Sequence, residues 1–283
     1  MQSFTRVPAL LGLFVVTSAV MDIRLLLADE SRLTSVTSGN FIAHTYPGGP
    51  SAEKVAKICE LLREQLVRAW CVSELSGWNP RCEVRVYASR NQYIQAVGPA
   101  GAQTLGSSLI QVNAVRTLSR RIDLLADSAG NLPALPHELT HVVMSDRFGG
   151  RQPPHWLDEG AAMLADSEQK KSLHERDCRK ALHDGSALPL SVLLHLEQFT
   201  SADQMPAFYG QSASLMKFLC SKGDINKITR FGVDAASHGY DQALLKHFEI
   251  KNVLDLEKQW KHFVYNTDAS QRLPAVLTVS FTP

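Results

Sequence analysis

The stretch Pro-His-Glu-Leu-Thr-His at residues 136–141 follows the pattern His-Glu-x-x-His, and a proline directly before it is typical of the first turn of a helix. On a helix, His137 and His141 lie one turn and about 40° apart, so both imidazoles can reach one metal ion. Glu138 lies beside them, where its carboxylate can face a water on the ion rather than the ion itself. The stretch therefore predicts a helix that carries two metal ligands and a base.

A second stretch, Pro-His-Trp-Leu-Asp-Glu-Gly-Ala-Ala at residues 154–162, predicts another helix. A catalytic zinc ion usually has three protein ligands plus water, so two histidines need a third partner. Glu159 is the candidate, because Asp158 points about 100° away on the same helix and Asp146 lies off the histidine face of the first helix. Small Gly160 and Ala161 indicate close packing of the second helix on the first. The alternative for Glu159 is a solvated acid stabilised by the helix dipole.

Together the two stretches resemble the gluzincin branch of the zinc metallopeptidases, in the peptidase MA-like group. They are similar to aminopeptidases whose ligand glutamate lies in Asn-Glu-Gly, although Asp158 replaces that Asn and the interval is one residue shorter. The chain has no Gly-Ala-Met-Glu-Asn segment, with which those enzymes hold an amino terminus. Thermolysin shares His-Glu-Leu-Thr-His, but Met163 stands where its later aspartate would be. The resemblance implies Glu138 as catalytic base and, as ligands of one Zn²⁺ ion, His137, His141 and Glu159.

The resemblance also implies a zincin-like sheet whose edge strand pairs with an extended substrate. Residues 104–111 are the candidate, with Gly106 permitting close backbone approach. Tyr209, near the start of a predicted helix, is the candidate O–H donor to the oxyanion, and an ordinary half-buried tyrosine is the alternative. His155 is interpreted as an exposed imidazole at a helix start, with support of Glu159 as the alternative. For Arg120 and Arg121, a solvated strand edge is favoured over contact with a substrate carboxylate.

The chain as a whole is predicted to be α+β, with a small mixed sheet followed by a helical half. Strands are expected at 41–46, 82–87, 108–112 and 121–125, and helices at 51–70, 137–146, 155–166, 168–183, 206–221, 224–236, 239–247 and 252–264. Ser51 is the expected cap of the first helix. We expect a sheet-bearing subdomain over 29–150, a helical subdomain over 151–265 and an irregular tail over 266–283.

Charge and the amino terminus limit the partners and the location. The 283 residues have a formal net charge of only +1, which gives no bulk electrostatic reason to bind nucleic acid or an anionic membrane. Residues 1–28 contain a basic start and an apolar run that predict a signal peptide, or a signal anchor that stays attached, and so an exported protein.

Among five cysteines, Cys71 and Cys82 flank a predicted turn and are the first candidate disulfide.

These observations predict an exported zinc metallopeptidase that acts on a peptide or protein substrate. The alternative belongs to another class of protein: a cell-envelope binding or scaffold protein that keeps a peptidase-like fold without turnover. The complete set of two histidines and two glutamates favours the enzyme, because a scaffold has no need of Glu138. Endopeptidase or exopeptidase action and the oligomeric state do not follow from the sequence.

Overall fold

The computed structural model describes residues 33–70, 77–113, 116–148 and 152–266, and from Thr34 onward the described chain forms one compact unit. The predicted signal segment at 1–28 and the predicted tail beyond Asn266 lie outside the described residues. So does Cys71, while Cys82 is a buried free thiol. The division into subdomains at residue 150 stays a prediction. In the described part, no helix is long and apolar enough to cross a membrane.

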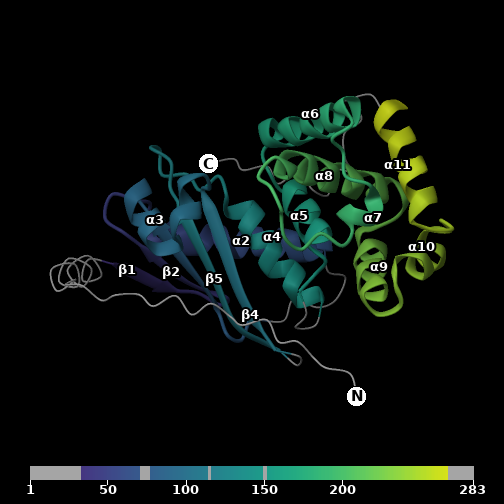
Figure 1. Ribbon diagram of the computed structural model, residues 1–283. Helices are drawn as coiled ribbons and strands as arrows, with labels where there is room; N and C mark the ends of the chain where they lie inside the picture. Colours follow the sequence, from purple (N-terminus) through teal and green to yellow (C-terminus); the bar gives the residue numbers. More distant parts are fainter. Residues whose placement is uncertain (1–32, 71–76, 114–115, 149–151, 267–283) are drawn as a thin grey trace, which may run out of the picture. The chain divides into compact units, whose positions relative to one another are not determined.

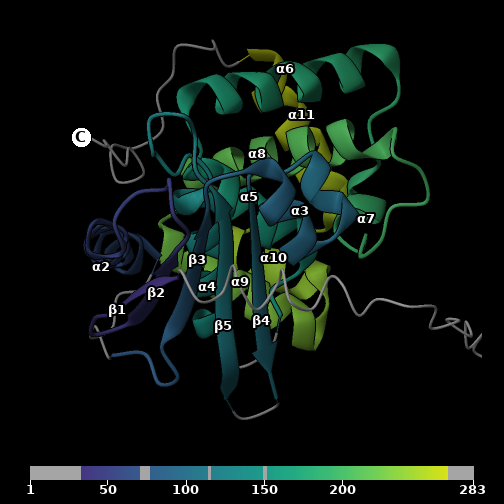
Figure 2. The same cartoon turned by 90° about the vertical axis from the view of Figure 1, so that its left-hand side faces the viewer.

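Five strands form one mixed sheet in the order β1-β2-β3-β5-β4 (Figures 1 and 2). Their bounds are Thr34–Thr37 for β1, Phe41–Thr45 for β2, Cys82–Tyr87 for β3, Gly106–Val112 for β4 and Thr117–Leu125 for β5. β2, β3 and β5 are parallel, whereas β1 and β4 pair antiparallel with their neighbours at the two edges. The α+β class is confirmed, and so is the predicted edge strand, because β4 has β5 as its only described neighbour.

The two faces of the sheet have different covers. Val84 and Ile122 are fully buried on the face that packs against α2 (Ala52–Trp70) and α4 (Leu135–Arg147). On the opposite face, α3 (Arg90–Val97) packs Tyr93 against Tyr87, with their ring centroids 5.9 Å apart. Ser51 caps α2 as predicted, since its Oγ accepts the Lys54 N–H at 3.2 Å. α4 is therefore held between the sheet and the helices that follow.

The helices after α4 lie beyond it, away from the sheet (Figure 1). Their bounds are His155–Leu164 for α5, Glu168–Asp184 for α6, Leu190–Leu193 for α7, Gln204–Lys222 for α8, Ile225–His238 for α9, Tyr240–Phe248 for α10 and Val253–Asn266 for α11. The predicted helices are confirmed to within about two residues at each end. The short elements β1, α3, η1 (Pro99–Ala102) and α7 were not predicted.

α5 packs on α4 as predicted, but the close approach at Gly160 is to α8. A Cβ at this position would lie 2.8 Å from the Ser212 carbonyl oxygen and 3.2 Å from the Met216 Cβ, and both atoms belong to α8. The backbone oxygen cannot move without distorting its helix. The absence of a side chain therefore sets the distance between α8 and the helix that carries Glu159.

We expect Gly160→Ala to lower the free energy of unfolding by about 1–3 kcal/mol, because the added methyl overpacks this crossing. Chemical denaturation of the two proteins measures the change. Gly39→Ala is the matched control, since the nearest atom to its Cβ would be 3.5 Å away, an ordinary contact. Equal stability of the wild type and Gly160→Ala would show that α8 can shift without cost.

Candidate metal centre

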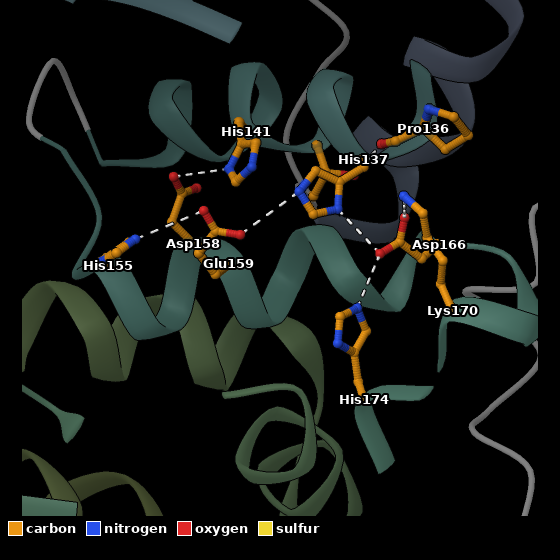
Figure 3. Close-up of polar contacts among 10 residues, drawn as sticks. Pro136, His137, His141, His155, Asp158, Glu159, Asp166, Lys170 and His174 are labelled. Carbon is orange, nitrogen blue, oxygen red and sulfur yellow. Dashed lines mark hydrogen bonds and ion pairs between the residues drawn. The ribbon is translucent and has the colours of Figure 1, made fainter. Parts of the chain in front are cut away.

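α4 and α5 bring two histidines and one glutamate together. His137 and His141 project from the same side of α4, with their ring centroids 4.9 Å apart, and Glu159 approaches them from α5 (Figure 3). One ligand atom from each of the three residues lies within 4.8 Å of the others. This group could hold a metal ion, and it is the ligand set that the sequence predicts.

Both histidines are oriented by carboxylates on their Nδ1 side. His137 Nδ1 lies 3.3 Å from Asp166 Oδ2, and His141 Nδ1 lies 2.9 Å from Asp158 Oδ2. On the other side, His137 Nε2 lies 3.7 Å from Glu159 Oε2. A carboxylate on one ring nitrogen fixes the ring and makes the other nitrogen a better ligand. Nε2 is therefore the ligand atom that each imidazole offers.

The donor set and its spacing fit zinc. Two imidazole nitrogens and one carboxylate oxygen are the ligands of many catalytic zinc sites, which keep a fourth position open. Ligand bonds of about 2.0–2.2 Å in a tetrahedron place the donor atoms about 3.3–3.6 Å from one another. The observed 3.7 Å between His137 Nε2 and Glu159 Oε2 is close to that spacing. All three ligand atoms lie within 4.8 Å of one another, so they would have to come closer together to coordinate one ion.

The charges of the site stabilise one another. Burial lowers the pKa of His141, but Asp158 together with Glu159 and Glu138 more than reverses this effect and raises the pKa to about 10. Burial raises the pKa of Glu159, yet its contacts with His155 and the two ligand histidines bring that pKa below its usual value. In the protein without metal, His141 therefore carries a proton that a metal ion must displace.

Asp166 belongs to the candidate site, although the sequence did not indicate it. It follows the end of α5, its side chain is 2% exposed, and it contacts three nitrogen-bearing side chains. Besides His137, these are Lys170, whose Nζ lies 3.2 Å from Oδ1, and His174, whose Nε2 lies 3.7 Å from Oδ2 (Figure 3). These contacts hold the pKa of Asp166 well below its usual value, against the opposing effect of burial. A buried, ionised carboxylate is thus fixed against a candidate metal ligand.

Asp166→Asn is expected to raise the dissociation constant for zinc by about 10–100-fold, the usual cost of removing an orienting carboxylate. Competition with a coloured zinc chelator measures this constant. Asp203→Asn, at an exposed position before α8, is the control and should leave it unchanged. Thermal unfolding of the metal-free proteins separates an effect on the ligand from an effect on the fold. An unchanged dissociation constant in a folded Asp166→Asn protein would contradict the orienting role.

Glu138 lies against the edge strand β4. Its side chain is buried, and a Cβ on Gly106 would lie 2.6 Å from its Cγ and 2.8 Å from its Oε1. The same added Cβ on Gly106 would also lie 2.7 Å from the Cβ of Ala134. Only glycine lets the strand approach so closely, as predicted for Gly106. The carboxylate is therefore held between α4 and β4.

A cleft with a volume of about 320 Å³ opens beside the candidate ligands. Part of β4 forms one wall, and His141 and Glu159 form another. Glu197, which follows α7, completes the lining together with the start of α5. The cleft thus joins the candidate metal centre to the edge of the sheet.

Two further predicted residues border this centre. Tyr209 is half-buried on α8, and burial together with Glu159 and Glu138 raises its pKa to about 12, so its O–H is present at neutral pH. His155 is partly buried, so its interpretation as an exposed imidazole is wrong. Its Nε2 lies 3.8 Å from Glu159 Oε1, and its Nδ1 is 3.2 Å from the Leu196 carbonyl oxygen. His155 therefore supports the third candidate ligand.

The two arginines of β5 have other roles than expected. Arg120 is 6% exposed, pairs with Asp146 and donates to the Pro80 carbonyl oxygen at 2.8 Å. Arg121 Nε lies 2.8 Å from Asp123 Oδ2 on the same strand. The interpretation of a solvated strand edge is wrong, because β5 is internal to the sheet and α4 covers Arg120. Asp146 is thereby engaged away from the candidate ligands, as the helix geometry predicts.

No protein-family model matches the chain, and no curated protein matches it. The interpretation of the site consequently depends on the geometry of its own residues. Within that geometry, the predicted set of His137, Glu138, His141 and Glu159 is brought together by α4 and α5.

Proposed function

We propose that the protein is a zinc-dependent peptidase of gluzincin type with a zincin-like fold. The convergence of His137, His141 and Glu159 carries the proposal, with Glu138 on the same helix as the first two. One zinc ion per chain would occupy this set. The helix order supports it too, since the third ligand comes from the helix directly after the one that carries the first two.

The division of labour among the residues follows from their chemistry. When bound, zinc supplies a Lewis acid for the scissile carbonyl and lowers the pKa of a water. Glu138 takes a proton from the attacking water and later delivers it to the leaving nitrogen. The water oxygen bonds to the carbonyl carbon and the C–N bond breaks, so one water is consumed for each peptide bond.

The edge strand β4 supports a peptide as the substrate class. The side of β4 away from β5 has no described strand beside it, and an extended peptide can pair there through its backbone. The contact between Gly106 and Glu138 means that such a peptide would pass close to the proposed base. A substrate held by main-chain hydrogen bonds suits a peptidase better than a hydrolase of small molecules.

Tyr209→Phe tests the proposed oxyanion donor. We expect kcat to fall by about 10²–10³-fold, because one hydrogen bond to the developing negative charge is lost, while KM changes little. Steady-state kinetics on a fluorogenic peptide measure both constants. An unchanged kcat would show that Tyr209 does not donate to the oxyanion and would favour the alternative of an ordinary half-buried tyrosine.

The proposed function includes export of the protein. The apolar run within residues 1–28 supports a signal peptide or anchor, and the substrate would then be an exported protein or peptide. Nucleic acid is not among the proposed partners, because the net charge is only +1.

The direct test is hydrolysis of a mixture of quenched fluorescent peptides by the purified, zinc-loaded protein. We expect cleavage that a chelator abolishes and that added zinc restores. A zinc-loaded, folded protein that cleaves none of the peptides would refute the peptidase proposal and favour the envelope scaffold protein.

A further inference from the structure

Three carboxylates, those of Asp158, Glu159 and Glu197, line the cleft beside the candidate ligands. Among the described residues, no lysine or arginine lines it. A divalent ion in the site would offset two of these three negative charges. Glu197 is the one of the three that is neither a candidate ligand nor paired with a candidate ligand.

Two of the three carboxylates already have partners. Asp158 lies against His141, and Glu159 lies against His137 and His155 as well as being a candidate ligand. Glu197 is different, because it forms no hydrogen bond or ion pair with any other described residue. It is exposed, and it contributes to the positive shift in the pKa of His155. Glu197 is therefore the carboxylate of the cleft that is available to a ligand.

Contacts place Glu197 close to the candidate metal centre. The carbonyl of its neighbour Leu196 lies 3.2 Å from Nδ1 of His155, whose Nε2 lies 3.8 Å from Glu159. Glu197 thus lies in the same cleft as Glu159, with His155 between its neighbour Leu196 and that candidate ligand.

Besides the polar side chains of Ser108, Ser145 and Gln152, the cleft has apolar residues that match a group with an apolar stem. Ile110, Val112 and Pro153 line the same cleft, and Leu109 on β4 is 54% exposed. Long basic side chains lay their methylene stems along apolar surface and keep their charge at its polar end. A cleft with an apolar wall and an available carboxylate provides both parts of such a site.

We propose that the cleft selects peptides with a cationic group near the scissile bond and that Glu197 is the residue that recognises this group. The inference rests on the proposed peptidase function and names its substrate class. Two sources share this chemistry: the side chain of arginine or lysine, and a free amino terminus. Glu197 acts by charge, so the preference depends on ionic strength.

Binding to the Glu138→Gln protein tests the proposal without turnover. Three versions of one peptide are compared by calorimetry: blocked ends with arginine, blocked ends with citrulline, and a free amino terminus with citrulline. Citrulline keeps the shape of arginine and lacks its charge. We expect a cationic peptide to bind about fivefold more tightly than the neutral one, the upper range for an exposed ion pair. Tighter binding of the arginine peptide would assign the recognised charge to the side chain. Tighter binding of the peptide with a free amino terminus would assign it to the terminus.

In Glu138→Gln/Glu197→Gln, we expect the cationic and the neutral peptides to bind equally tightly. In Glu138→Gln/Glu197→Lys, we expect the cationic peptide to bind more weakly than the neutral one. The matched control is Glu53→Gln in the Glu138→Gln background, since Glu53 is an exposed residue of α2 that does not line the cleft. The inference would be overturned if all three peptides bound equally or if none of them bound. It would also be overturned if the cationic peptide still bound more tightly after Glu197→Gln.

Hydrolysis of the same peptides by the wild type separates the two proposals. Cleavage without preference for charge would overturn the role of Glu197 and leave the peptidase proposal standing. Charge-dependent binding through Glu197 without any cleavage would overturn the peptidase and retain the cationic ligand.

Discussion

Replacing Glu138 by glutamine is expected to reduce hydrolysis of a peptide by about 10²–10⁴-fold while zinc stays bound. The amide has the shape of the carboxylate but cannot take a proton from water, and general acid–base catalysis contributes a factor of this size. Glu138 is not among the three candidate ligands, so the metal content should remain at one ion per chain. Single-turnover hydrolysis and elemental mass spectrometry on the same sample measure both quantities.

Glu168→Gln provides the control for this substitution. Glu168 lies in the first turn of α6 with its side chain 79% exposed, so the same chemical change there should leave the rate constant unaltered. A Glu138→Gln protein that is folded, contains zinc and cleaves as fast as the wild type would exclude Glu138 as the base. If the biological role also survived, the envelope scaffold protein would be the better interpretation.

The motif residues could be predicted because local geometry determines them. His137 and His141 share a helix face by their spacing alone, and prolines 136 and 154 mark where two helices begin. The same periodicity gave most helix bounds to within about two residues. The edge strand was also predicted correctly, although only the structure shows that Gly106 touches Glu138.

The orienting carboxylates could not be predicted from the sequence in the same way. Asp166 meets His137 only because the chain turns after α5, and 29 residues separate the two. Helix geometry predicts that Asp158 is not a ligand, but the contact of Asp158 with His141 depends on how α5 packs on α4. Such contacts between elements follow from tertiary packing, for which the sequence offers no spacing rule.

The missed elements had weak signals of their own. α3 buries only Tyr93, and in β1 Val36 is the one residue that is not exposed. Neither segment has the run of apolar residues from which periodicity is recognised. The close approach of α8 at Gly160 was missed for a similar reason. Small residues indicate that a helix is close, but the sequence does not say which helix.

His141→Ala is expected to abolish stoichiometric zinc binding and, with it, hydrolysis. The substitution removes one of three ligands and leaves Asp158 without the imidazole that faces it at 2.9 Å. Two remaining ligands would bind zinc far more weakly, because every lost donor must be replaced by water. Elemental mass spectrometry of the purified protein should find about one zinc per chain in the wild type and almost none in the variant.

The comparison needs a histidine that lies outside the site. His183 is 89% exposed near the end of α6, so His183→Ala should keep its zinc. His141→Ala also empties part of a buried site, so a native circular dichroism spectrum is required before loss of zinc is attributed to the ligand. A wild type without zinc, even after reconstitution, would refute the metallopeptidase. Full zinc occupancy in a folded His141→Ala protein would instead show that the ion binds elsewhere. The carboxylate that faces His141 would then not be orienting a metal ligand.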